Sequence, residues 1–550
     1  MQSFLPADND VALRAMESTA FLSQGSCVQL SKSEHPLVLV RSDVESLKTR
    51  GQVALLSGGG SGHEPAMAGL VGRGLLSCAV AGRVFASPPY DDVLAGIRAC
   101  GSSGGVLVVC MQYTGDVVNF TAAVEDARRE YGLKVGMVVV DDDASGAAPR
   151  MRRGLAGTLL IHKLAGAAAE LGWDLDGVVG VAKDALPRLA TVNMGFGHCT
   201  LPGKAGKPAM DAGTCEFGLG IHGEPGAETL ASPDARGAAH LLVGKLVDAV
   251  SLVEGQACCL VLNNLGTMSQ LDMLVFASHA REELRRRGVE VARVYSGTLM
   301  TALDTRGLSV TVLACPSANE LSLLDFPVDC LGWAPRPPSA PNAPVQLAPR
   351  LANSPKRARA AGLLPAVAAR RLEAVLEALA QAADKLDGLD AKCGDGDCGA
   401  TVAASVQRLR AALAPKATED CLPADDVLRA AESACAGGSL GGIFRAVFAK
   451  ARDGAAATWA QALQRGIEAA KEAGGADVGA RSFLDALIPA SRAATLKEAA
   501  VLARQGANAT RSMVATVGRA AHVPVDKYAG SVDPGAEAVA VFFEALSALP

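Results

Sequence analysis

The chain has 550 residues, too many for one hydrophobic core, so we expect several domains. Hydrophobic residues make up 49% of it and charged residues 20%, which is typical of a globular protein with helix-rich parts. A net charge of −5 argues against nucleic acid or an acidic membrane surface as partner. The 14 cysteines form no C-x-x-C pair, so neither a zinc site nor a disulfide framework is indicated.

Targeting signals are not apparent. Residues 1–27 lack a basic start followed by a continuous apolar run, and no later segment is apolar over the length that a membrane span needs. We therefore expect no membrane span and a cytoplasmic location, with an atypical organelle address left open.

The first 332 residues alternate short apolar runs with glycine-rich turns and helical patterns. Four runs are continuously apolar, as in a sheet covered on both faces: Leu37–Val40, Val53–Leu56, Val106–Cys110 and Gly136–Val140. A second set flanks a helical pattern from Ser269 to Arg287 and consists of Cys258–Leu262, Val291–Tyr295 and Ser309–Leu313. The pattern predicts an α/β domain over residues 1–332 with two α/β subdomains, about 1–190 and 191–332.

The second half has a different character. Residues 333–360 are rich in proline, alanine and asparagine, which is typical of an extended, solvated linker between domains. From residue 361 to 550, apolar residues recur at helical spacing and no convincing strand is found. We expect an all-helical domain there.

A glycine-rich segment, Ser57–Pro65, follows the predicted strand Val53–Leu56. It predicts a strand-to-helix turn, with Pro65 in the first helical turn and backbone N–H groups free for an oxygen-rich ligand. No Gly-Lys-Ser/Thr follows, so it is not a Walker loop. The alternative is a tight turn in which His63 caps locally, and the residues alone favour the two about equally.

Tyr113–Asp116 follows the predicted strand Val106–Cys110 in the same way. Ligands bind beyond the carboxyl ends of parallel strands, so Asp116 is placed for acid–base work or for holding hydroxyls. The alternative is a helix-capping aspartate. Because His63 and Asp116 follow two different strands alike, we favour the functional interpretation.

Gly218–Gly226 sets His222 among four glycines, which is more typical of a histidine shown to a ligand than of one packed in a core. The segment also fits G-x-G-x-x-G. A dinucleotide fingerprint needs a hydrophobic strand before it, however, and residues 207–214 are polar and contain glycine and proline. We interpret that match as accidental.

Leu389–Gly399 contains three carboxylates, Asp390, Asp395 and Asp397, separated by glycines. They repel one another unless a hard cation lies between them, so we predict a Mg²⁺ site. An EF-hand is excluded because Ala400 stands where that loop needs glycine. A solvated acidic turn is the alternative. Mg²⁺ with open coordination positions normally carries nucleotide phosphates.

Three less specific candidates for a ligand site lie in the predicted helical domain: Gly437–Gly442, Arg481 and Asp533–Gly535. Each is either a turn between helices or, next to a metal site, a source of N–H donors and positive charge for phosphate.

Together these motifs resemble the dihydroxyacetone kinase family in its single-chain ATP-dependent form, also called triokinase. The resemblance covers nearly the whole chain. The segments that match the substrate, or K, domain are Ser57–Ala66, Tyr113–Asp116, Gly154–Lys163, Gly218–Gly226 and Asn263–Gly266, and those that match the nucleotide, or L, domain are Leu389–Gly399, Gly518–Ala520 and Asp533–Gly535. The resemblance implies a K domain of two α/β subdomains and an L domain that is a barrel of antiparallel helices with the Asp loop at one end.

The same resemblance implies roles for residues of the K domain. His222 matches the histidine that forms a covalent hemiaminal with the substrate carbonyl, a reaction open to a neutral imidazole nitrogen. His63 and Asp116 match the pair that manages protons, with Asp116 as base. The substrate-lining positions are Gly60, Ser61, Gly62, His63, Met111 and Asp116.

In the L domain, Asp390, Asp395 and Asp397 match the ligands of two Mg²⁺ ions that bridge the ATP phosphates. The positions that match ATP contacts are Cys398, Gly399, Ala400, Thr401, Ser439, Leu440, Gly474, Arg481, Ser482, Asp533, Pro534 and Gly535. Two departures bear on function. Met111 replaces a substrate-contacting lysine of the family, and Leu440 replaces the second serine of its Gly-Gly-Ser-Ser-Gly loop.

The resemblance implies a kinase that transfers the ATP γ-phosphate to dihydroxyacetone, and also to glyceraldehyde, as a homodimer in which the K domain of one chain meets the L domain of the other. One alternative is a lyase that splits FAD into cyclic FMN and AMP at the L-domain metals, preferably Mn²⁺. Another is a regulatory or binding protein with weak catalysis. A phosphoenolpyruvate-linked form is less expected, because its two domains are usually separate chains.

Overall fold

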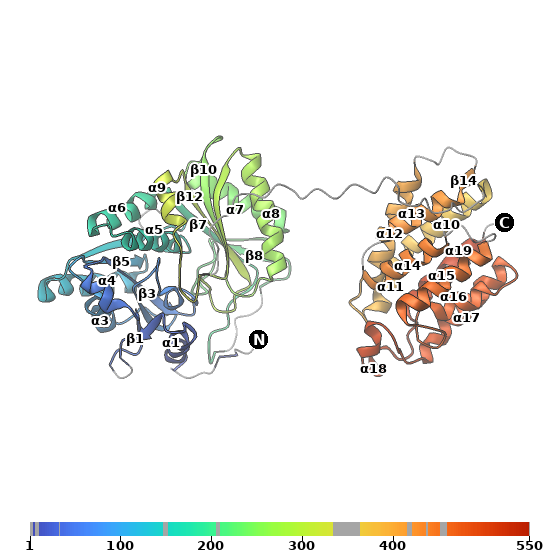
Figure 1. Cartoon of the computed structure of the whole chain (residues 1–550), viewed down its shortest axis with the longest axis horizontal. Helices are drawn as coiled ribbons and strands as arrows, with labels where there is room; N and C mark the ends of the chain where they lie inside the picture. Colours follow the sequence, from blue (N-terminus) through green and yellow to red (C-terminus); the bar gives the residue numbers. More distant parts are fainter. Residues whose placement is uncertain are drawn as a thin grey trace. The chain divides into compact units, whose positions relative to one another are not determined.

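The structure, a computed structural model, describes residues 4–5, 10–31, 34–146, 152–204, 210–333, 363–414, 421–435, 438–451 and 459–548. It divides into two compact units, Met1–Pro344 (unit 1) and Val345–Pro550 (unit 2), shown in Figure 1. Apart from Trp333, the predicted linker 333–360 lies outside the described residues, so the domain limits stay a prediction. Among helices of the described part, none is both long and apolar enough to cross a membrane.

The first sheet of unit 1 has the strand order β1-β2-β4-β3-β5-β6. Its strands β3 to β6 pair in parallel, and β1 and β2 form an antiparallel edge. The strands are β1 (Cys27–Gln29), β2 (Val38–Arg41), β3 (Ala54–Ser61), β4 (Cys78–Val84), β5 (Val106–Met111) and β6 (Val135–Val140). The four strands predicted in this region are therefore confirmed.

Helices cover both faces of this sheet. On one face, α3 (Tyr90–Cys100) and α4 (Thr114–Tyr131) form a core with apolar side chains of β3 and β5. On the other face lie α5 (Thr158–Glu170) and α6 (Leu175–Ala185). Burial on both faces explains why these strands read as continuous apolar runs rather than as an alternating pattern. The short helices at the edge are α1 (Val11–Leu22) and α2 (Val44–Thr49).

The second sheet has the order β11-β10-β12-β7-β8-β9. All three strands predicted here are confirmed, as is the helix α8 (Gln270–Arg286), which begins at a capping box formed by Ser269 and Asp272. The strands are β7 (Leu189–Gly195), β8 (Thr214–Phe217), β9 (Glu228–Ala231), β10 (Ala257–Asn264), β11 (Glu290–Gly297) and β12 (Gly307–Ala314).

The two sheets share a core, which makes unit 1 one compact body. In β10, Leu260 and Leu262 pack toward α7 (Ala235–Ala249) and α8, which Figure 1 shows beside this sheet. The alternate residues Cys259 and Val261 pack into the core that also holds α5 and the first sheet. Successive strand residues point to opposite faces, so this alternation joins the two layers. The helix α9 (Ala318–Leu324) packs against α5.

Unit 2 is a ring of helices. Consecutive helices from α10 to α17 pack against one another along the chain, α17 packs against α19, and α19 packs against α10, which closes the ring. The helices are α10 (Ala366–Gln381), α11 (Ala383–Asp390), α12 (Cys398–Leu413), α13 (Ala424–Ala434), α14 (Gly438–Ala451), α15 (Trp459–Gly474), α16 (Leu484–Ser491), α17 (Leu496–Ala509), α18 (Val525–Tyr528) and α19 (Pro534–Ala548). A helical barrel is thus confirmed.

One detail of the all-helical prediction is wrong. A small antiparallel pair joins β13 (Leu363–Pro365) to β14 (Cys421–Pro423). Each strand has three residues and ends in proline, and each leads directly into a helix. Segments this short are below the length at which alternation of apolar residues can be recognised.

Candidate active site and metal loop

The glycine-rich segment after Val53–Leu56 is strand, not the turn that the sequence predicts, because β3 continues to Ser61. The glycines are needed because a neighbouring segment passes close by. A Cβ added at Gly58 would lie 2.3 Å from the Val80 carbonyl oxygen, and one at Gly60 would lie 2.9 Å from the Ala86 nitrogen. Pro65 also does not begin an α-helix, because it is followed by a turn and by the short 3₁₀ helix η1 (Ala68–Leu70).

His63, just beyond the end of β3, is buried and held by a backbone carbonyl. Its Nδ1 lies 2.8 Å from the Thr301 carbonyl oxygen. Because a carbonyl oxygen only accepts, Nδ1 carries the ring proton and Nε2 carries the lone pair. Burial lowers the pKa of His63 to about 4, so the ring is neutral at pH 7.

His222 lies in the loop between β8 and β9. A short strand, β8, does precede this loop, contrary to our interpretation of residues 207–214, but β9 follows instead of a helix. The segment is therefore still not a dinucleotide fingerprint, because that motif needs a helix after the glycine-rich turn. The His222 ring makes edge contacts with His63, Phe85 and Tyr113 at centroid distances of 4.9, 5.3 and 4.7 Å. Its Nε2 is 3.2 Å from Nε2 of His63.

Asp116 lies in the first turn of α4, where its Oδ2 accepts a hydrogen bond of 2.8 Å from the Ser87 hydroxyl. Within the described part of the chain, its Oδ1 and the Tyr113 hydroxyl are both buried without a hydrogen-bond partner. Burial raises the pKa of Asp116, and the hydrogen bond from Ser87 and the electrostatic effect of the nearby His222 ring oppose this rise. Buried polar atoms are normally paired, so these two suggest a ligand.

The other expected substrate-lining residues lie along β3 and at the end of β5. The Ser61 hydroxyl donates to the Gly82 carbonyl at 2.8 Å, and Gly62 adopts a positive φ of 104°. Met111 is buried, with its methyl group near Gly59, where an added Cβ would lie 3.3 Å from it. Contact of Gly60, Ser61, Gly62 and Met111 with a substrate stays a prediction.

Sequence reasoning missed several residues around the two histidines. Thr301, Phe85 and Ser87 come from segments without a recognisable motif. Glu224 stands inside the glycine-rich segment around His222, and Arg153 directly precedes the matched segment Gly154–Lys163. The charged side chains of Glu224 and Arg153, next to matched motifs, were the signal by which these two residues could have been found. Asn263, in a segment that matches the family, has a structural role. Its Oδ1 accepts the N–H groups of Leu299 and Met300, at 2.9 Å each, and so holds the segment that leads to Thr301.

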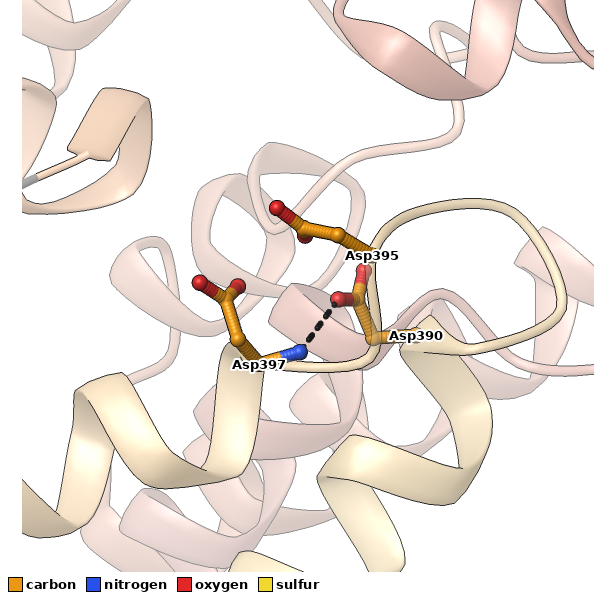
Figure 2. Close-up of side chains that lie close together, drawn as sticks. All are labelled: Asp390, Asp395 and Asp397. Carbon is orange, nitrogen blue, oxygen red and sulfur yellow. Dashed lines mark hydrogen bonds between the residues drawn. The ribbon is translucent and has the colours of Figure 1, made fainter. Parts of the chain in front are cut away.

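In unit 2, the three predicted metal ligands come together. Asp390 ends α11, and Asp395 and Asp397 lie on the loop that leads into α12 (Figure 2). Each offers an oxygen, and these atoms lie within 4.8 Å of one another. The Asp390 Oδ2 also accepts the N–H groups of Gly396 and Asp397, at 2.9 and 3.1 Å, which shapes the loop. An all-oxygen set of this kind fits Mg²⁺.

A cavity of about 230 Å³ opens beside this loop. Many of the expected metal and nucleotide contacts line it: Asp390, Asp397, Cys398, Thr401, Gly474, Arg481, Ser482, Asp533, Pro534 and Gly535. The N–H groups of Gly399 and Ala400, two further expected contacts, donate to Asp387 Oδ1 at 2.5 and 3.1 Å, and contact of these residues with a nucleotide stays a prediction.

The predicted turn Gly437–Gly442 is also wrong in part. Residues from Gly438 onward form the first turn of α14, and Gly437 lies outside the described residues. The side chains of Ser439 and Leu440 lie outside them too. The first N–H groups of a helix have no intrahelical partner, so this turn can still donate to an anion.

Arg481 and Asp533 form the polar wall of the cavity. Arg481 is buried at a φ of 58°; its guanidinium lies 4.2 Å from the Tyr528 ring centroid and donates to the Ser531 carbonyl at 3.2 Å. Its Nη1 is 4.0 Å from Asp533 Oδ2. Burial raises the pKa of Asp533 to about 6, against the effects of the Ala536 amide and Arg481.

Comparison with known proteins agrees with this division. Residues 21–331 match the Dak1 domain, and residues 392–548 match the DAK2 domain. A putative 3,4-dihydroxy-2-butanone kinase of Solanum lycopersicum is 38% identical, over 92% of this chain and 91% of its own. The triokinase/FMN cyclase of Homo sapiens is 34% identical, over 92% and 93%. The crystal structure of the dihydroxyacetone kinase of Citrobacter freundii with AMP-PNP and Mg²⁺ has a TM-score of 0.63 and 31% identity, and the match covers 99% of each chain.

Proposed function

The chain belongs to the dihydroxyacetone kinase family, and from this premise we propose that it is an ATP-dependent kinase of dihydroxyacetone that also accepts glyceraldehyde. The observation that carries the proposal is the contact of His222 with His63 at 3.2 Å, near the Asp116 oxygen that has no hydrogen-bond partner among the described residues. A second chemical centre, the Asp390 loop with its cavity, is suited to a metal-bound nucleotide.

We propose that His222 captures the substrate covalently. A ring nitrogen adds to the carbonyl carbon, so an N–C bond forms and the π electron pair of the carbonyl moves to oxygen. That oxygen takes up a proton and the ring gives one up, which leaves a neutral hemiaminal. The adduct fixes the substrate for the second step. Glycerol has no carbonyl group and would not be held.

In the second step, a substrate hydroxyl attacks the γ-phosphorus of ATP and must lose its proton. The Asp116 Oδ1 would accept this proton, and its burial without a partner among the described residues supports that role. The lone pair of His63 Nε2 is placed to accept a hydrogen bond from a hydroxyl of the bound substrate.

In unit 2, Asp390, Asp395 and Asp397 would hold Mg²⁺, which when bound neutralises charge on the phosphates during transfer. Asp533, Pro534 and Gly535 at the start of α19 line the cavity, α14 reaches it through Ile443, and Arg481 adds a buried positive charge. The contacts of these residues with ATP are part of the proposal.

The donor phosphate and the acceptor hydroxyl are bound in different units, so the two units must meet during transfer. We propose that they do so within a homodimer, unit 1 of one chain with unit 2 of the other. Mixing a His222→Ala chain, which alone should phosphorylate dihydroxyacetone only slowly, with an Asp395→Ala chain, which alone should be inactive, should then raise the activity above that of either chain. Monomers by sedimentation, together with a mixture that is no more active than either chain, would contradict this arrangement.

Substrate choice is expected to centre on small hydroxyketones. The names of the tomato and Citrobacter relatives give two such ketones, and His222 would address the carbonyl group that both contain. Met111 makes the end of β5 apolar where the family carries a lysine, so we propose that affinity for the second hydroxymethyl arm is lower here. A cytoplasmic location remains our prediction.

A second candidate is cleavage of FAD to cyclic FMN and AMP. The observation in its favour is that the metal loop and its cavity lie entirely in unit 2, and the human relative carries both activities in its name. Mn²⁺ would be the preferred metal. A regulatory protein with weak catalysis is disfavoured, because the side chains of both centres are present.

The test is ADP release in a coupled assay with Mg-ATP and dihydroxyacetone, D-glyceraldehyde or glycerol. We expect turnover with the first two and none above background with glycerol. No turnover with any of them, while Mg-ATP still binds, would overturn the kinase proposal. Formation of cyclic FMN from FAD with Mn²⁺ would then support the lyase.

A further inference from the structure

Asp397 stands at the N-cap of α12 but does not cap this helix with its side chain. Its carbonyl oxygen accepts the Thr401 N–H at 2.9 Å, the first hydrogen bond of the helix. An N-cap aspartate normally accepts a further N–H of the first turn with its carboxylate, but Asp397 makes no such capping hydrogen bond. One oxygen of its carboxylate lies instead within 4.8 Å of an oxygen of Asp390 and of Asp395. Figure 2 shows the three side chains gathered at this loop.

Asp387, on the neighbouring helix α11, provides the missing cap. Its Oδ1 accepts the N–H groups of Gly399 and Ala400, at 2.5 and 3.1 Å. These are the second and third residues of α12, whose N–H groups an N-cap side chain normally accepts. The positive end of the helix dipole also favours a carboxylate at this place. Asp387 therefore does from α11 what Asp397 would otherwise do from the start of its own helix.

The close approach of α11 and α12 makes this arrangement possible. Gly399 leaves no room for a side chain, because a Cβ there would lie 1.9 Å from the Ala383 carbonyl oxygen. Asp387 precedes Asp390 by three residues, so both carboxylates lie on the same face of α11. Asp390 holds the end of the loop through two N–H groups, and Asp387 holds the first turn of α12 through two more. Of these two residues, only Asp390 is also an expected metal ligand.

We propose that Asp387 is a positioning residue of the metal site, which caps α12 so that the carboxylate of Asp397 stays directed at the cation. This inference rests on the magnesium site of the proposed function. A carboxylate of Asp397 turned back onto the first turn of α12 would leave the other two aspartates. Mg²⁺ demands near-ideal octahedral geometry, so the displacement of one ligand weakens its binding. Removal of the Asp387 carboxylate should therefore lower metal affinity more than it lowers the stability of the helix.

The test compares Asp387→Ala with Asp387→Asn in the full chain. In Asp387→Ala, the carboxylate of Asp397 is expected to take over the cap. Affinity for Mg²⁺ with AMP-PNP, measured by calorimetry, should then fall by about 10- to 100-fold, the usual cost of losing a group that orients a metal ligand. Asp387→Asn keeps a carbonyl oxygen that accepts the same N–H groups, so it should bind nearly as tightly as the wild type. Asp384→Ala, an exposed change in the first turn of α11, is the matched control.

Urea unfolding of the metal-free chain in EDTA is the second readout, because it detects the cap without any ligand. The unfolding midpoints of Asp387→Ala and Asp397→Ala should each stay close to that of the wild type, since in each variant the other aspartate caps α12. The double variant has neither carboxylate, so its midpoint should fall below those of both single variants. Such a non-additive loss is what two residues that serve the same N–H groups produce.

An Asp387→Ala chain that binds Mg²⁺ and AMP-PNP with wild-type affinity would overturn the inference. So would an Asp387→Ala chain that fails to fold, or whose midpoint falls as far as that of the double variant, because Asp397 would then not take over the cap. If the wild type itself binds no Mg²⁺ with AMP-PNP, the proposed metal site fails and the inference fails with it. The unfolding of the double variant still shows in that case whether the two aspartates serve the same N–H groups.

Discussion

His63 and His222 meet through their Nε2 atoms at 3.2 Å although 159 residues separate them in the chain. His63 comes from the end of β3 in the first sheet, and His222 from a hairpin of the second sheet. The core shared by the two sheets places them together. The Thr301 carbonyl fixes the proton of His63 on Nδ1, so the His63 nitrogen that faces His222 is a base.

His63→Asn should keep the fold and lose the base. The asparagine amide can take over the hydrogen bond to the Thr301 carbonyl, but nothing replaces the Nε2 lone pair. We expect kcat with dihydroxyacetone to fall by about 10²–10⁴, the usual contribution of a positioned acid or base. Thermal unfolding serves as the control for folding. A variant that melts like the wild type and turns over at the wild-type rate would remove His63 from the mechanism.

Much of this site could be predicted because its residues follow buried strands or sit among glycines. His63, Asp116 and His222 each stand in such a segment, and the carboxyl ends of the strands gather them. Glu224 and Arg153 could not be assigned, because a carboxylate and a guanidinium acquire their parts only when the hairpin closes on the first sheet. The glycines of β3 predict a turn, and that prediction is wrong because the glycines make room, within a strand, for the close approach of the segment that carries the Val80 carbonyl.

The metal loop gives a separate prediction. Asp395→Asn and Asp397→Asn each remove a charged ligand, so Mg-ATP binding measured by calorimetry should weaken at least about 100-fold, because loss of groups that merely support a ligand already costs 10- to 100-fold. Glu373→Gln is the matched control. Glu373 pairs with Arg410 on the surface of the same unit, and its change should leave binding unaltered. Binding by both aspartate variants with wild-type affinity would contradict a magnesium site here.

His162, in the middle of α5, is buried, and neither ring nitrogen has a hydrogen-bond partner within the described residues. Burial lowers the pKa of His162 to about 3. The unfolded chain therefore binds more protons than the folded chain between pH 3 and about 6.5, and stability falls on acidification.

His162→Leu should raise the free energy of unfolding of unit 1 by about 1–3 kcal/mol at pH 7, because an unpaired buried polar group is removed. The gain should grow at pH 5. Calorimetry at both pH values checks this, with the exposed His240→Gln as control. A His162→Leu chain that is less stable than the wild type would contradict this prediction, because it would show that the ring nitrogens of His162 are hydrogen-bonded in the folded chain.

The effect of Asp533 on the pH dependence of stability should be opposite to that of His162. Its pKa, raised by burial to about 6, means that the folded chain binds more protons than the unfolded chain between about pH 4 and 6. The resulting stabilisation is present at low pH and is lost as the pH rises through 6. Asparagine keeps the oxygen that accepts the Ala536 N–H at 2.8 Å and carries no charge.

Asp533→Asn should therefore be more stable than the wild type by about 1–3 kcal/mol at pH 8, in the absence of nucleotide, and equal to it near pH 4. Asp526→Asn, an exposed change in the same unit, should have little effect at either pH. Urea unfolding of the full chain at the two pH values measures the difference. A stabilisation that is the same at both would mean that Asp533 is ionised throughout.

The measurement that tests the account most directly is the ratio of kcat/KM for dihydroxyacetone to that for glycerol, in the wild type and in His222→Ala. If His222 captures the carbonyl, the wild-type ratio should exceed about 10³, and the variant should lose most of it while phosphorylating both compounds slowly. A wild-type enzyme that uses glycerol as readily as dihydroxyacetone, or a variant that keeps the wild-type ratio, would contradict covalent capture by His222.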